Sequence, residues 1–330
     1  RGDAVADEEH ERFDHNHRLP GFDLEGRMAG RINRANALLS TMTGPAHARV
    51  SEVAAAAGSI AILGFPVPAI ASDVHGALDV PMTLAGSYRL PQIETQIAGQ
   101  AVEVPLLGRV RATARLTANT KRADITNIDV RRGTSVITGE AIANATNRTW
   151  TGRFAVDAPH GEEWQAELPA AWRVAGPVQV ASTLGGTFDV YTLDTTITGS
   201  SLTWAGQTID RATAKAIVTP SAIDVTSLEL HQGAGFLDGR IRYAWETGAY
   251  PASLKGDRLS WQGTLLAPND TQALFSIQFD GEGTAAQPRG QARVDFSLAG
   301  GVAGTLIGAG EMTADTSGDH ARVVARLPVM

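Results

Sequence analysis

The chain has 330 residues, with 28 basic and 35 acidic side chains, a net charge of −7 and no cysteine. A sequence-independent nucleic-acid binder needs a basic stripe to displace counterions, so we expect no nucleic-acid partner. The lack of cysteine excludes disulfides, thiolate metal sites and cysteine nucleophiles. Hydrophobic residues make up 43% of the chain and charged residues 19%, whereas about 25% charged is usual. The chain therefore has more hydrophobic residues than a monomer with a high surface-to-volume ratio would bury.

The N-terminal segment, residues 1–18, is polar and charged and has no periodicity, which predicts a flexible terminus. It contains the only His-rich cluster of the chain, formed by His10, Asp14, His15 and His17. A metal site needs ligands that converge from a rigid frame. We therefore expect no metal site in this segment.

Helical periodicity is confined to two short candidates, residues 31–43 and residues 53–57. The second begins a stretch, residues 53–72, that carries no charge and has the length of a membrane span. Pro66 and Pro68 force extended backbone there and cannot continue a helix. The sequence favours a buried extended segment over a transmembrane helix.

The chain repeats itself without a gap at an offset of 100 residues. Arg111-Ala112-Thr113-Ala114 recurs as Arg211-Ala212-Thr213-Ala214. The glycines keep the same register, at Gly86 and Gly186, Gly99 and Gly199, Gly133 and Gly233, and Gly139 and Gly239. Self-similarity at a fixed period is typical of a modular, elongated structure.

Alternation with period two dominates from residue 19 onward, as expected for half-buried strands. Residues 109–116 place Val110, Ala112 and Leu116 on one face and arginines on the other. Turn residues recur every 8 to 14 positions. That spacing leaves no room for the crossover helices that a parallel sheet requires, and it predicts an antiparallel meander.

The alternation slips by one residue at the same place in both copies. Apolar positions run from Ile125 to Ile128 in the first copy and from Val225 to Leu228 in the second. A one-residue slip would turn the following side chains to the wrong face unless a bulge absorbs it. We therefore predict a bend near Thr126-Asn127 and another near Thr226-Ser227.

These patterns predict an all-β fold, a long antiparallel β-meander that packs as a sandwich, closes into a barrel or curls so that its apolar face lines a trough, and we favour the curled form. Residues 19–330 would form one continuous repetitive groove, with repeat copies from about 79 and about 179, in a fragment of a longer protein. The inner residues are small or β-branched and poor in aromatics, which would leave the curled sheet hollow. An ordinary packed core remains the alternative.

No motif in the chain has the arrangement of an active site. Glu162, Glu163 and Glu167 near Trp164 fit a solvated loop, and the glycines of 233–239 fit repeat turns. We therefore expect a protein that is not an enzyme, with no catalytic residue and no cofactor. The candidate functional surface is the apolar face, which would hold acyl chains. Its candidate lipid-binding residues are Leu84, Ile97, Val102, Val104, Val110, Ala112, Leu116, Val180, Leu184, Ile197, Leu202, Ala212, Val218, Phe275, Ile277, Val294 and Phe296.

Several runs resemble the TamB branch of the AsmA-like envelope proteins. They are residues 84–94 continuing to 102–104, residues 228–243, and residues 259–263 followed by 279–284 and 288–290. The resemblance covers most of residues 19–330. It rests on the order in which turn residues and alternating strand patterns follow one another along the chain. It implies a meander curled into a U-shaped, taco-like groove with an apolar inner face. It also implies a bridge-like protein of the diderm envelope, located in the periplasm, with an inner-membrane anchor outside this fragment.

The resemblance also implies a function, namely a non-enzymatic conduit for phospholipid between the inner and outer membranes. Phospholipid would be its ligand, and an outer-membrane barrel protein its partner through regions outside this fragment. One alternative is a structural β-scaffold, or an envelope assembly factor for outer-membrane proteins that transfers no lipid. Another is a polysaccharide-active β-domain, which should gather carboxylates and exposed aromatics in one cleft.

Overall fold

The computed structural model of the chain is described here for the residues whose placement is defined. They are residues 10–19, 22–31, 41–51, 53, 74–87, 90–104, 107–165, 173–204, 206–261, 271–284, 288–300, 305–317 and 320–326.

The chain divides into two compact units. The first comprises Arg1–Phe154 and Leu184–Asp189, and the second comprises Ala155–Thr183 and Val190–Met330. Each unit is described by itself below.

The first unit is an antiparallel meander in which each strand pairs with the next one in the sequence. Its strands are β1 (His10–Leu19), β2 (Phe22–Arg31), β3 (Thr41–Val50), β4 (Leu78–Ser87), β5 (Leu90–Val104), β6 (Gly108–Asn119), β7 (Arg122–Arg132) and β8 (Ser135–Asn144). Two further strands, β9 (Thr149–Ala158) and β11 (Val178–Thr187), have residues in both units.

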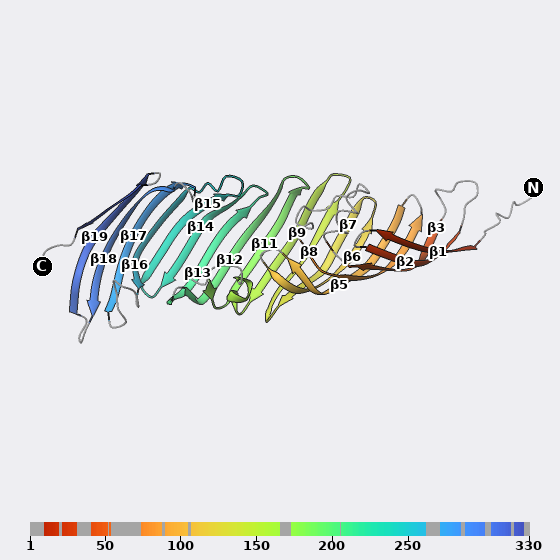
Figure 1. Cartoon of the computed structure of the whole chain (residues 1–330), viewed down its shortest axis with the longest axis horizontal. Helices are drawn as coiled ribbons and strands as arrows, with labels where there is room; N and C mark the ends of the chain where they lie inside the picture. Colours follow the sequence, from red (N-terminus) through yellow and green to blue (C-terminus); the bar gives the residue numbers. More distant parts are fainter. Residues whose placement is uncertain are drawn as a thin grey trace, which may run out of the picture. The chain divides into compact units, whose positions relative to one another are not determined.

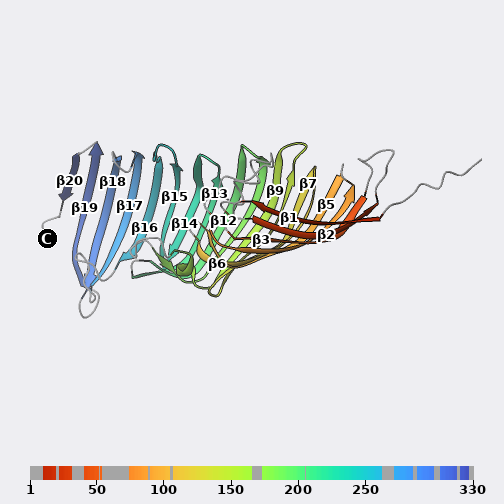
Figure 2. The same ribbon diagram turned by 45° about the vertical axis from the view of Figure 1, so that its right-hand side comes forward.

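The second unit continues the same pattern. From β12 onward each strand again pairs antiparallel with its successor, and the strands lie side by side in chain order (Figures 1 and 2). The strands are β10 (Val174–Ala175), β12 (Tyr191–Trp204), β13 (Gln207–Val218), β14 (Ala222–Gln232), β15 (Gly235–Ala244), β16 (Ala252–Trp261), β17 (Thr271–Gly283), β18 (Pro288–Gly300), β19 (Thr305–Ser317) and β20 (His320–Arg326).

The predicted all-β antiparallel meander is confirmed, because consecutive strands form the ladders of both units. The one multi-residue helical element of the described chain is the short 3-10 helix η3 (Gly161–Gln165). One expectation differs from the structure. Residues 10–18, expected to be part of a flexible terminus, belong to strand β1, while residues 1–9 lie outside the described part.

The first helix candidate, residues 31–43, is wrong at both ends. Arg31 closes β2 and Thr41 opens β3, so these positions have extended backbone. The candidate's middle lies outside the described residues, as does most of the second candidate and of the uncharged stretch 53–72. No helix in the described part of the chain is long and apolar enough to span a membrane.

The two predicted bends are confirmed as β-bulges. The register of β7 against β8 shifts between Ile125 and Ile128, and the register of β14 against β15 shifts between Val225 and Leu228. In the first bulge Asn127 has a φ of 52°, in the left-handed region that Asn tolerates better than most residues. The bulge keeps the apolar residues on one face, as the alternation requires.

The 100-residue repeat is visible in the strand positions. Strands β6, β7 and β8 recur almost residue for residue as β13, β14 and β15. The turn glycines match as well, since Gly133 has a φ of 57° and Gly233 a φ of 56°. A positive φ of this size is adopted without steric cost only by glycine, which explains why both copies keep it.

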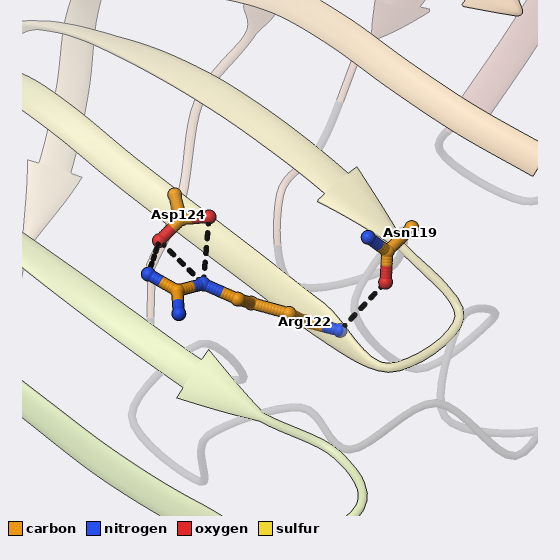
Figure 3. A network of polar contacts seen from close by, with 3 residues as sticks. All are labelled: Asn119, Arg122 and Asp124. Carbon is orange, nitrogen blue, oxygen red and sulfur yellow. Dashed lines mark hydrogen bonds and ion pairs between the residues drawn. The ribbon is translucent and has the colours of Figure 1, made fainter.

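Side chains close the turns between repeated strands. In the β6–β7 turn the Asn119 Oδ1 atom accepts a hydrogen bond from the backbone N–H of Arg122 at 2.9 Å (Figure 3). It accepts another from the backbone N–H of Lys121 at 2.8 Å. The Arg122 guanidinium pairs with the Asp124 carboxylate at 2.6 Å. In the second copy Thr219 Oγ1 takes the role of Asn119, accepting from Ala222 N at 3.0 Å. Local side-chain bonds of this kind favour turns over continued strand.

Candidate functional site

The candidate site is one face of each sheet, which we call the apolar face and define by Val110, Ala112 and Leu116 of β6. In the first unit the register places Val102 opposite Val110 and Gly99 opposite Ala112. Residues directly opposite in an antiparallel ladder share a face. The ladder therefore extends the apolar face from β6 into β5, and Leu84 of β4 joins it through its partner Ile93.

The second unit carries an equivalent apolar face. Ile197 lies opposite Ala214, and Leu202 lies opposite Ile209. Phe275 and Ile277 of β17 lie opposite Phe296 and Val294 of β18. Of the other predicted positions, Val104 lies in β5, Ala212 and Val218 lie in β13, and Val180 lies in β11. Leu184 lies in the part of β11 that belongs to the first unit.

Glycines let bulky side chains of this face pack over the backbone. A Cβ atom at Gly199 would lie 2.7 Å from Leu202 Cδ1. Gly99 stands in the same relation to Val102 in the first copy. Because nine in ten real Cβ contacts are longer than 3.4 Å, a side chain at either glycine would force the Val102 or Leu202 side chain to shift. In both copies of the repeat, a bulky residue thus packs over the glycine that lies three residues before it in the sequence.

Most predicted residues of the apolar face are only half-buried. Val102, Val110 and Leu202 are 4, 2 and 5% exposed and so pack against neighbours. The others with described side chains are intermediate in exposure, and the Phe296 side chain is outside the described part. No second layer seals these described positions. The sequence reasoning did not separate the three packed residues from the half-exposed ones.

The two ends of the strands differ. We call the end with the β5–β6, β7–β8, β12–β13 and β14–β15 turns the capped end, and the opposite end the free end. At the capped end of the first unit, Val53 donates its N–H to Gly76 O at 3.1 Å and packs against Val50 and Val80. Val53, which lies outside the strands, therefore packs on the apolar face there.

The second unit has a matching cap. Gly161 of η3 donates its N–H to Gly176 O at 2.8 Å, and the Glu162 carboxylate accepts from Gly176 N at 3.2 Å. A Cβ at Gly161 would lie 3.0 Å from Val178 Cγ2, so η3 touches the apolar face. Glu162, considered as a catalytic carboxylate in the sequence, holds this cap in place. Gly76 and Gly176 lie 100 residues apart, at equivalent positions of the repeat, and have φ angles of 116° and 109°. This match in the sequence was the signal from which the cap could have been predicted.

The opposite face of each sheet is polar and carries cross-strand ion pairs. Arg153 of β9 pairs with Glu140 of β8 at 2.6 Å, and Arg115 pairs with Glu94. Arg131 hydrogen-bonds the Asp129 carboxylate at 2.7 Å and lowers the pKa of that carboxyl. Exposed pairs of this kind contribute little to stability, and they mark this face as the solvated one.

A hollow of about 860 Å³ lies on the polar face of the second unit, between β14 and β18. Its charged lining is mixed in sign, with Arg240 and Arg242 beside Asp224, Asp280 and Glu282. Asp280 accepts a hydrogen bond from Ser253 Oγ at 2.7 Å. The lining contains no aromatic side chain, so it does not form the cleft of aromatics and carboxylates that a polysaccharide-active domain needs.

No group of acidic, histidine or cysteine side chains in the described ranges could hold a metal ion. Of the His-rich cluster, His10, Asp14, His15 and His17 are placed in strand β1, whose side chains lie outside the description.

No family model matches the chain. Comparisons with curated proteins and with solved structures likewise give no match.

Proposed function

We propose that the chain is a non-enzymatic carrier of phospholipid, in which acyl chains lie on the apolar face while head groups stay in water. The observation that carries the proposal is the half-exposure of this face. Apolar ladders such as Ile197–Ala214 and Ile277–Val294 are continuous from strand to strand, yet their described side chains are not covered by a second layer.

The energetics of burial support a lipid as the guest. Each CH₂ group removed from water contributes about 0.8 kcal/mol, so partial shielding of two acyl chains is sufficient to hold a lipid. The lining is nearly uniform in Ala, Val, Ile and Leu, and neighbouring strands lie about 4.8 Å apart. A guest can therefore move from one strand to the next between sites of similar free energy, as transport requires.

The cellular setting of the proposal rests on the resemblance to TamB-like envelope proteins. It places the carrier in the periplasm of a diderm bacterium as part of a conduit between the two membranes. An inner-membrane anchor and an outer-membrane barrel partner belong to the same proposal and would involve regions outside this chain.

Photo-crosslinking tests the proposal. A photoreactive amino acid at Ala112 or Val180, both half-buried on the apolar face, should capture phospholipid from phosphatidylethanolamine vesicles. Matched probes at Arg111 and Lys215, exposed on the polar face, should capture at least tenfold less. Equal capture at the two faces would contradict the proposal and would favour a structural scaffold.

A further inference from the structure

The exposure of bulky apolar residues differs between the two ends of the strands. Every Val, Leu or Ile side chain of the described residues that is buried lies at or near the capped end. These residues are Val50, Val80, Val102, Val110, Leu202 and Ile209. Towards the free end the buried side chains of the meander are alanines, such as Ala141 and Ala216, together with Thr95. The apolar face is thus closed at one end and open at the other.

The free end of the second unit carries exposed amphipathic aromatics. Tyr243 and Trp245 are 37 and 48% exposed, and their rings meet edge to face at 5.5 Å. Trp245 Nε1 donates a hydrogen bond to Thr219 O at 3.3 Å, which fixes the indole across the β13–β14 turn. Tyr243 lies opposite Ile223, which in turn lies opposite Val218. The aromatic pair therefore continues the apolar ladder to its open end.

Rings with one polar atom are favoured where an apolar environment meets water. A Tyr hydroxyl can donate to an ester carbonyl, while its ring packs against the first methylenes of an acyl chain. The same chemistry places Trp and Tyr at the head-group level of membranes. No such pair is found among the described side chains of the capped end, where Trp204 is 37% exposed beside Val174 of β10.

The open face is long enough to hold a lipid tail. From Ile209 to Val218 strand β13 rises about 30 Å, at roughly 3.4 Å per residue. One leaflet of a bilayer needs about 15 Å for its hydrocarbon, half of the usual core. An acyl chain laid along the strand therefore fits between the aromatic pair and the cap.

We infer that lipid binds the second unit in one orientation, with its acyl ends toward the cap and its ester and head-group region beside Tyr243 and Trp245. This inference rests on the proposed function and adds the side from which lipid enters and leaves. Head groups would pass along the free end from strand to strand, while η3 prevents escape at the capped end.

Two photoactivatable phosphatidylcholines test the orientation on the full chain, one with a diazirine at the acyl terminus and the other with a diazirine on the head group. Peptide mapping should find the head-group probe on the peptide that contains Tyr243 and Trp245, at least fivefold above the peptide that contains Trp204 and Ile209. The acyl-terminal probe should show the opposite preference.

The outcomes separate the two proposals. Equal or reversed labelling of the two peptides would overturn the orientation and leave the lipid-carrier proposal standing. No labelling above background by either probe would overturn both. Replacement of Trp245 by alanine should lower head-group labelling at the free end several-fold, whereas W204A should leave it unchanged.

Discussion

Replacing Ala112 by aspartate should abolish lipid capture around β6 and leave the fold intact. Ala112 is half-buried on the apolar face, between its partners Gly99 and Val130. A carboxylate there stays hydrated in the free protein but must lose water against an acyl chain, at a cost of at least about 3 kcal/mol. That cost weakens binding about 100-fold. Lipid captured by a photoreactive residue at Leu116 measures the loss, and circular dichroism measures the fold.

The control lies two residues away on the same face. Val110 is 2% exposed, so V110D places a charge in a packed site and should unfold the unit. Val180→Asp should behave like Ala112→Asp in the second unit. Were Ala112→Asp to unfold the protein as V110D does, the apolar face would be an ordinary packed core and the carrier proposal would fail.

The second large effect concerns the glycines that the repeat keeps at offset 100. Gly139→Ala and Gly239→Ala should each destabilise the chain by about 1–3 kcal/mol, the usual cost of overpacking. A Cβ would lie 2.7 Å from Arg153 O in the first copy and 2.8 Å from Ser253 O in the second. Both obstacles are backbone atoms of the adjacent strand, which cannot rotate away. Urea denaturation measures the change in the free energy of unfolding.

Gly185 provides the matched control, because a Cβ there has no neighbour within 4 Å. Gly185→Ala should be neutral or slightly stabilising, since alanine lowers the entropy of the unfolded chain. If all three variants lose the same stability, the close approach of the neighbouring strand is not the reason why both copies of the repeat have glycine at positions 139 and 239.

Local patterns in the sequence were sufficient to predict the fold class and the two bulges. The alternation of apolar residues slips by one residue between Ile125 and Ile128 and again between Val225 and Leu228. Because the alternation has a period of two residues, each slip required a bulge to keep the apolar residues on one face. The spacing of the turns predicted the meander, because 8 to 14 residues between turns leave no room for the crossover helices of a parallel sheet.

Contacts between distant segments could not be predicted in the same way. Val53 and Gly161 cap the apolar face through backbone bonds to Gly76 and Gly176, and neither bond leaves a periodic signal. The sequence analysis also placed Val110 among the open lining positions, whereas the structure buries it. The terminal segment was misjudged because charged residues can still form a strand at the edge of a sheet, as in β1.

The central claim is that the apolar face is open and takes up acyl chains, and spin-label accessibility tests it most directly. The chain has no cysteine, so Leu116→Cys and Arg115→Cys can each carry a single nitroxide on opposite faces of β6. Without lipid, the label at 116 should collide with a water-soluble nickel reagent. Phospholipid should then raise its collision rate with oxygen, lower that with nickel, and leave the label at 115 unchanged. A label at 116 that is shielded from both reagents before lipid is added, and unaffected by it, would contradict the account.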